Sequence, residues 1–243
     1  MKNLIKYLLQ KILGYQTYLY TFAKYKIRNI ESDKKEKDFF VFMDQIDKSG
    51  ILLDVGANIG IMTYHLCKRF TDRKVMAIEP MPSNLEVLMK VIEKYDLENA
   101  ELIPMAVGNE HDQEIKMILP KQGKVKMQGL AHVKHDSITE WNEGEEYTVM
   151  SDTLDNLTSG EKIAGIKMDI ENFEFFALEG ATRILTEDKP VVYLELWEND
   201  NRDQCFDLLE KLGYQAYVST EAGLKAYDPQ IHQKQNFIFK HPN

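Results

Sequence analysis

The stretch that decides the fold is Ile51-Leu52-Leu53-Asp54-Val55-Gly56-Ala57-Asn58-Ile59-Gly60. Its apolar start is typical of a central parallel strand that is covered on both faces. Gly56 and Gly60 let the backbone turn sharply and approach a ligand closely. Residues 61–67 are apolar at roughly helical spacing. A strand, a glycine turn and a helix in this order predict a nucleotide site at the carboxyl end of the strand.

Two acids, Asp54 in the turn and Glu79 after the next strand, indicate which nucleotide binds. Glu79 ends the next predicted strand and lies 23 residues after Gly56, where a carboxylate accepts hydrogen bonds from a ribose. The dinucleotide motif G-x-G-x-x-G is not met, because position 58 is Asn. Asp54 would repel a pyrophosphate but attract an ammonium group. S-adenosyl-L-methionine (SAM) therefore fits this turn better than NAD. In the alternative, Asp54 only caps the next helix and the glycines only turn the chain.

Further segments follow this turn in a set order. Together they resemble the FkbM-type family of class I SAM-dependent methyltransferases. The matching segments are residues 54–60, 78–80, 153–155, 166–171 and 194–195. The resemblance covers about residues 50 to 196. The family usually has Gly where this chain has Asn172, so a noncatalytic module that binds SAM or a nucleoside is the alternative.

Strand and helix patterns alternate along the chain and predict an α/β fold with a doubly wound, mostly parallel, seven-stranded Rossmann-like sheet. We expect the third strand at residues 102–107 and a helix at 173–185. The resemblance implies that the last strand is antiparallel. Residues 1–48 are expected to be an N-terminal helical extension and residues 49–243 the methyltransferase domain. An inserted hairpin is expected at about residues 110–150, because that connection is too long for a simple crossover.

The turn, the end of the second strand and the resemblance together define the expected cofactor site. SAM is the expected cofactor. The residues expected to contact it are Asp54, Gly56, Ala57, Asn58, Gly60, Glu79, Pro80, Ala106 and Val107. No acid lies in the turn after the third strand, so we expect adenine to be recognised by backbone and apolar contacts.

Catalytic candidates lie at the ends of the fourth and fifth predicted strands. Asp169, Glu171 and Glu195 should meet in one crevice with the glycine turn, since carboxyl ends of parallel strands share an edge. A hydroxyl acceptor must lose a proton, which favours a nearby base. His132 and His135 are the alternative bases. Three carboxylates could also hold Mg²⁺ or Ca²⁺, but no metal is expected, because the resemblance does not require one.

Composition limits the classes of partner. The net charge of −9 gives no broad basic surface, so a nucleic-acid partner is not expected. Cys67 and Cys205 have neither metal-ligand spacing nor a disulfide framework, which fits a cytoplasmic protein. No apolar run reaches the length of a transmembrane helix, and the N-terminus lacks the small-residue cleavage site of a signal peptide.

Residues 1–30 form a distinct segment. Their apolar residues recur at helical spacing, and they contain six Lys or Arg and no acid. A basic amphipathic helix of this kind can lie on an anionic membrane, which would make the protein membrane-peripheral. We favour the alternative, in which the segment packs on the catalytic domain or against the second subunit of a homodimer, because its aromatic residues suit protein packing.

The sequence therefore predicts a SAM-dependent methyltransferase. The resemblance, and not the spacing, implies O-methylation of a hydroxyl or carboxyl group on a small molecule or glycan. An NAD-dependent oxidoreductase is disfavoured by the missing glycine motif.

Overall fold

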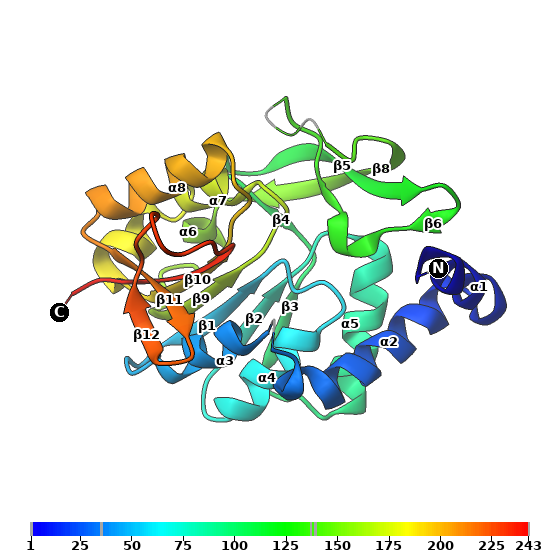
Figure 1. Ribbon diagram of the computed structural model, residues 1–243, viewed down its shortest axis with the longest axis horizontal. Helices are drawn as coiled ribbons and strands as arrows, with labels where there is room; N and C mark the ends of the chain where they lie inside the picture. Colours follow the sequence, from blue (N-terminus) through cyan, green and yellow to red (C-terminus); the bar gives the residue numbers. More distant parts are fainter. Residues whose placement is uncertain (1, 35, 137, 139, 243) are drawn as a thin grey trace.

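The computed structural model describes residues 2–34, 36–136, 138 and 140–242, but not the side chains of residues 2–4. A central sheet of eight strands runs through the molecule (Figure 1). In spatial order its strands are β12 (Gly223–Ala226), β11 (Gln215–Thr220), β13 (Asn236–Lys240), β10 (Val191–Glu195), β9 (Ile163–Met168), β1 (Ile51–Val55), β2 (Val75–Ile78) and β3 (Ala100–Ile103). Strands β10, β9, β1, β2 and β3 are mutually parallel. The expected α/β fold is confirmed, and β13 is antiparallel to both neighbours as expected.

The count of seven strands was wrong by one. Strand β12 forms a hairpin with β11 at the edge of the sheet. Its four residues, Gly223-Leu224-Lys225-Ala226, are mostly exposed. A run this short that begins with Gly gives little sequence signal for a strand.

The third strand also differs from the expectation. Pairing with β2 ends at Ile103, and the next two-residue strand, β4 (Ala106–Val107), pairs in parallel with β8 (Gly144–Asp152) of a second sheet. Pro104 lies between the two pieces and cannot donate a backbone hydrogen bond to a ladder. The chain therefore leaves the central sheet at Pro104 and crosses to the second one.

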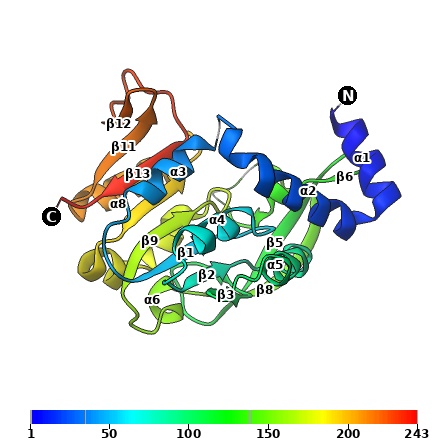
Figure 2. The same ribbon diagram turned by 90° about the horizontal axis from the view of Figure 1, so that it is seen from below.

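The expected inserted hairpin is confirmed. Strand β5 (Gln113–Gln122) pairs antiparallel with β8 along its length. The chain between them adds β6 (Val125–Lys126), the 3₁₀ helix η2 (Gln128–Leu130) and β7 (His132–Val133). Figure 2 shows this second sheet beside α5 and the β3 edge of the central sheet. The insertion thus extends the molecule on the side where β1 and β2 end.

Helices cover both faces of the central sheet, as the buried strands require. Leu52 faces one core, with α3 (Lys37–Asp44), α4 (Ile61–Arg69) and α5 (Pro82–Lys94), whereas Leu53 faces the other. The opposite face is covered by α6 (Leu154–Leu157), α7 (Glu174–Glu179), the π-helix η3 (Ile184–Asp188) and α8 (Asp200–Lys211). The single helix expected at 173–185 is broken after α7, where a Cβ on Gly180 would lie 2.1 Å from the Gly108 carbonyl oxygen.

The N-terminal segment forms α1 (Lys2–Leu13), α2 (Tyr15–Asn29) and the 3₁₀ helix η1 (Ile30–Ser32). Helix α2 buries Tyr18, Leu19, Ala23 and Ile27 in the core shared with α4 and α5. This half of the segment packs on the α/β fold of the same chain, as favoured from its aromatic residues. In the part of the chain that the structure describes, no helix is long and apolar enough to cross a membrane.

Candidate active site

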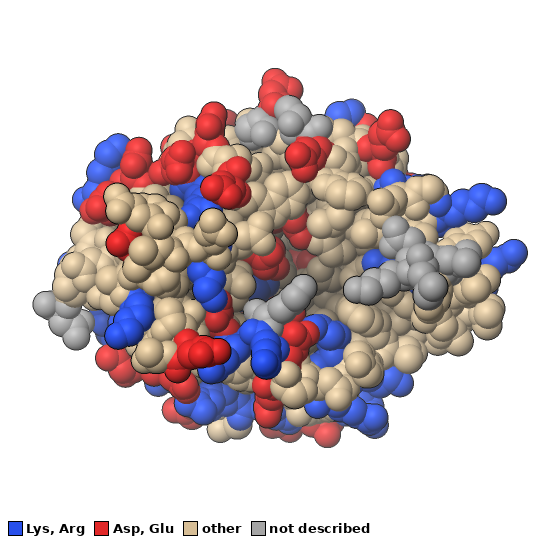
Figure 3. Space-filling model, in the orientation of Figure 1, with Lys and Arg blue, Asp and Glu red and all other residues tan. Residues whose placement is uncertain are grey.

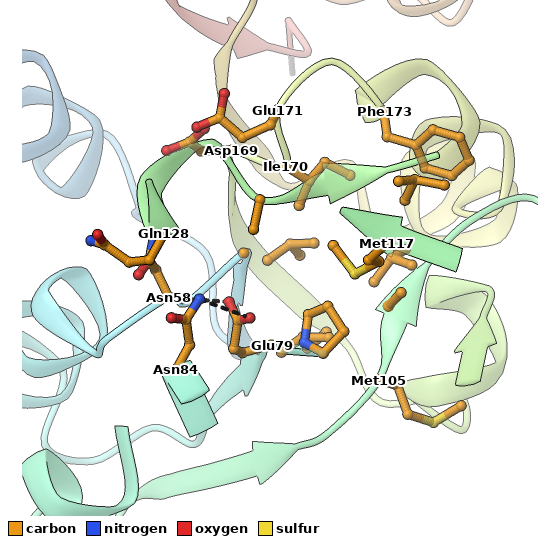
Figure 4. A pocket seen from close by; sticks show the side chains of 18 of the residues that line it. Asn58, Glu79, Asn84, Met105, Met117, Gln128, Asp169, Ile170, Glu171 and Phe173 are labelled. Carbon is orange, nitrogen blue, oxygen red and sulfur yellow. Dashed lines mark hydrogen bonds between the residues drawn. The ribbon is translucent and has the colours of Figure 1, made fainter. Parts of the chain in front are cut away.

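A pocket lies where β1, β2 and β9 end, between the central sheet and the insertion (Figure 4). About 560 Å³ of space, open solvent included, lies between its lining residues. The β1 turn supplies Gly56 and Asn58, and the end of β2 supplies Glu79 and Pro80. The remaining walls include Met105, Ala106 and Val107 after β3, Met117, Gln128 and Val133 from the insertion, and Asp169, Ile170, Glu171 and Phe173 after β9.

Glu79 is the buried acid at the centre of this pocket. One carboxylate oxygen accepts the backbone N–H of Asn58 at 2.8 Å. The other accepts the Met81 N–H at 2.8 Å and the Asn84 amide at 3.2 Å, the latter contact visible in Figure 4. Burial raises the pKa of Glu79 to about 7, although these donors oppose the shift. Glu79 thus joins the β1 turn to the start of α5.

Asp54 lies behind the turn and is fully buried. It accepts a hydrogen bond from the Thr63 hydroxyl at 2.6 Å and lies 3.4 Å from the ammonium group of Lys167. Lys167, on β9, is also buried and donates to the Gly56 carbonyl at 3.0 Å. Burial by itself lowers the pKa of Lys167, but the charges of Asp54 and Asp169 more than offset this and raise it. A buried ion pair therefore supports the glycine turn from below.

Gly56 is required by packing. Its φ is +75°, and a Cβ there would lie 2.0 Å from the Asp169 carbonyl oxygen. No side chain fits this separation, so glycine brings the β1 turn against the loop after β9. The turn and the acids after β9 consequently share one wall of the pocket.

Asp169 and Glu171 lie at one end of this wall (Figure 4). Burial and the charge of Asp169 raise the pKa of Glu171 to about 10. Burial also raises the pKa of Asp169, although the charge of Lys167 opposes the rise. The charge of Asp169, followed by burial, raises the pKa of Glu195 to about 7. The three expected acids therefore interact electrostatically, but Glu195 lines a neighbouring, wider groove.

The loop that carries these acids has an unusual backbone. Glu171 and Asn172 have φ values of +56° and +76°, in the left-handed region that favours glycine. Asn tolerates this region better than most residues. The Asn172 side-chain oxygen accepts from the Asn199 amide at 2.8 Å, and its carbonyl accepts from the Asn201 amide. Asn172 thus adopts the backbone conformation for which glycine is ordinarily used.

The model of the "Methyltransferase FkbM domain" family matches residues 54–218, more than half of the chain. The chain belongs to the FkbM methyltransferase family. Residues 54–218 are therefore a SAM-dependent methyltransferase domain, and SAM is the cofactor of this domain. The eight-stranded, mostly parallel central sheet is Rossmann-like. Asn172, at the position where the resemblance leads us to expect Gly, has the left-handed backbone conformation that glycine favours.

Two solved structures have a similar fold. The FkbM methyltransferase from Methylobacillus flagellatus KT is 17% identical over 99% of this chain, with a TM-score of 0.56. The chain covers 59% of the length of that protein. A precorrin-6y C5,15-methyltransferase from Geobacter metallireducens GS-15 is 12% identical, with a TM-score of 0.51 over 86% of this chain and 90% of that one. No curated protein matches the sequence.

The pocket of this FkbM methyltransferase fits SAM. The side-chain oxygens of Asn58, Asn84 and Gln128 are buried without a hydrogen-bond partner, and all three residues line the pocket. Buried acceptors of this kind ordinarily have donors, and SAM carries an ammonium group, an amino group and ribose hydroxyls. Apolar side chains of Met105, Met117 and other lining residues face the same space.

The expected cofactor residues divide into two groups. Gly56, Asn58, Glu79, Pro80, Ala106 and Val107 line the pocket. Asp54, Ala57 and Gly60 lie in or behind the turn and are not among the lining residues. The structure adds residues that the sequence did not single out, chiefly Asn84, Met105, Met117, Gln128 and Phe173. The only sequence signal for Met117 and Gln128 was the inserted hairpin expected at about residues 110–150.

The two alternative bases lie outside the pocket wall. Both ring nitrogens of His132 are within hydrogen-bond distance of oxygens, at 2.8 Å from Leu130 and 3.2 Å from Asn142. His135 packs against Phe173 and Phe176. Among the described residues, no three His, Cys, Asp or Glu side chains are grouped as metal ligands.

Proposed function

We propose that this enzyme transfers the methyl group of SAM to an oxygen of a small molecule or glycan, with residues 49–243 as the catalytic domain and residues 1–48 as an extension. The observation that carries the proposal is the position of three acids between the cofactor pocket and the wider groove beside it. Asp169 and Glu171 line the cofactor pocket, and Glu195 lines the wider groove. Acidic side chains are visible in the central hollow of Figure 3.

The bound cofactor supplies an electrophilic methyl group. The contribution of the chain is to place an acceptor oxygen in line with that methyl and to take its proton. We favour Asp169, which lines the cofactor pocket, as the group that takes this proton. Glu195, with a pKa of about 7, is the second candidate for a general base near neutral pH. Glu171, with a pKa of about 10, is protonated there and donates a hydrogen bond to the acceptor. The acidic wall repels a carboxylate acceptor, so we favour a hydroxyl over a carboxyl group.

We assign the cofactor contacts by position. Glu79 accepts from the ribose, while Gly56 and Asn58 contact the methionine part. Ala106 and Val107 contact the adenine through backbone and apolar groups. Asp54 acts through the turn that it supports. A cytoplasmic location is part of the proposal, and Cys67 and Cys205, both free and buried, support a reducing compartment.

The test is transfer from labelled SAM to a panel of hydroxylated metabolites, glycans, carboxylic acids and amines. We expect label on a hydroxylated acceptor and release of S-adenosylhomocysteine. Asp169→Asn should lower the rate by about 10²–10⁴, the range for loss of a positioned acid–base group. SAM affinity should change by less than about tenfold, because Asp169 acts on the acceptor. Asp72→Asn, an exposed acid far from the pocket, is the matched control.

Two results would contradict the proposal. Methylation confined to the amines would overturn the O-directed chemistry. An Asp169→Asn enzyme with near-normal turnover would move the main catalytic role to Glu195 or Glu171, and equivalent single variants of these two residues would then show which one has it.

A further inference from the structure

The apolar side chains of α1 face away from the protein. Ten large hydrophobic residues are exposed in the part of the chain that the structure describes, and half of them lie on this one helix. They are Ile5, Leu8, Leu9, Ile12 and Leu13. Their spacing places them on one side of a helix. The result is a continuous apolar stripe on the outside of the molecule, where scattered single residues would be ordinary.

The polar side of α1 holds the helix on the protein. Gln10 donates to the Lys126 carbonyl at 3.2 Å, and the Lys6 ammonium lies 3.8 Å from the Met127 sulfur. Tyr7, Lys6 and Gln10 are half-buried, whereas the apolar residues are exposed. A helix on a globular protein ordinarily buries its apolar side. In α1 the polar side contacts the protein and the apolar side is exposed, so the apolar stripe does not attach α1 to the protein.

Charge identifies what the stripe contacts. Residues 1–30 contain six of the 30 Lys and Arg and none of the 39 Asp and Glu, so they carry +6 while the rest of the chain carries 24 − 39 = −15. The adjoining hairpin adds Lys121, Lys124 and Lys126, of which Lys121 and Lys126 neutralise Glu145. In Figure 3 the atoms at the α1 end of the molecule that are not drawn in grey are tan and blue. Lys26 pairs with Asp33 and Glu36 on the far side of the segment. Lys11 on α1 and Lys124 on the adjoining hairpin are exposed, and these two residues form the basic rim of the stripe.

We propose that α1 lies in the surface of an anionic lipid membrane, with its apolar stripe among the acyl chains and Lys11 and Lys124 at the headgroups. A 12-residue helix is about 18 Å long and binds in the plane of the surface. A second copy of this chain is a poorer partner for the stripe. Around a two-fold axis the basic rims would face each other, and residues 1–30 contain no acid to pair with them.

The experiment uses the intact chain and phosphatidylcholine vesicles with and without phosphatidylglycerol. We expect co-sedimentation with the anionic vesicles in low salt and release in high salt. A Leu8→Glu/Ile12→Glu variant should bind at least about tenfold more weakly, because it places two charges in the apolar stripe. Met150→Glu/Ile231→Glu also changes two exposed apolar residues, but away from α1, and should bind like the original chain.

Calorimetry with SAM on the same samples separates this proposal from the proposed function, since α1 contributes no residue to the cofactor pocket. The membrane proposal is overturned if the folded chain binds no anionic vesicle, or if both double variants bind equally well. It is also overturned if sedimentation equilibrium shows a dimer that Leu8→Glu/Ile12→Glu dissociates while vesicle binding is absent, because the stripe then belongs to a second copy.

Discussion

Lys167→Met should be among the most destabilising single changes in this enzyme. Lys167 is 4% exposed, and its ammonium lies 3.4 Å from the fully buried carboxylate of Asp54. Removal of one partner of a buried pair leaves the other charge uncompensated, which costs roughly 3–5 kcal/mol. The hydrogen bond to the Gly56 carbonyl is lost as well. Methionine fits the space with little change in packing, so the loss reports charge.

The assay is urea unfolding followed by circular dichroism, with the free energy of unfolding obtained by linear extrapolation. Asp54→Asn/Lys167→Met removes both charges and keeps an acceptor for the Thr63 hydroxyl. We expect this double variant to lose roughly 1–3 kcal/mol, less than Lys167→Met alone. Lys162→Met, at an exposed lysine just before the same strand, should change stability by less than about 0.5 kcal/mol.

If Lys167→Met lowers the free energy of unfolding by less than about 1 kcal/mol, which is the range of an exposed ion pair, Lys167 and Asp54 do not form a stabilising buried pair. The single variant Asp54→Asn completes the comparison. If the losses of stability in Asp54→Asn and Lys167→Met simply add up to the loss in the double variant, the two groups do not interact, and the role of the ion pair is refuted.

Three other predictions follow from buried groups. Glu79→Ala should weaken SAM binding by roughly 1–3 kcal/mol in calorimetry, the loss for hydrogen bonds to a charged group; unchanged affinity in the folded protein would remove Glu79 from the site. Asn172→Gly should keep turnover within about tenfold, whereas Asn172→Val should lose stability by roughly 1–3 kcal/mol, because φ is +76° and β-branched residues are strained there; equal stability of the two would contradict this. Burial raises the pKa of Glu174 from 4.5 to about 8, so its folded form holds a proton more tightly than its unfolded form. Stability from this group is therefore complete below pH 4.5 and falls by about 1.4 kcal/mol per pH unit up to pH 8; Glu174→Gln should flatten that slope, and an unchanged slope would assign it to other acids.

Most of the central sheet and one edge of the pocket could be predicted because their signals are local. The sequence around Gly56 specifies a strand and a turn with few neighbours involved, and Glu79 follows at the spacing of one crossover. Both residues line the pocket. The ends of β9 and β10 carry the expected acids Asp169 and Glu195 for the same reason. The two wrong predictions for the sheet also have local causes. The four residues of β12 give little sequence signal for a strand, and Pro104 was included within a strand that it interrupts.

The sequence by itself determined the family, the cofactor class and the strand ends, those of β1, β2 and β9, that line the pocket, because strand patterns and turn residues act over short distances. Only the tertiary structure decided which side chains meet. It paired Lys167 with Asp54, 113 residues apart, and brought Met117 and Gln128 over the pocket from the insertion. It also placed α1 with its polar side on the protein and its apolar stripe in solvent. Such contacts join residues distant in the chain, and they depend on how layers pack, which periodicity in one segment does not specify.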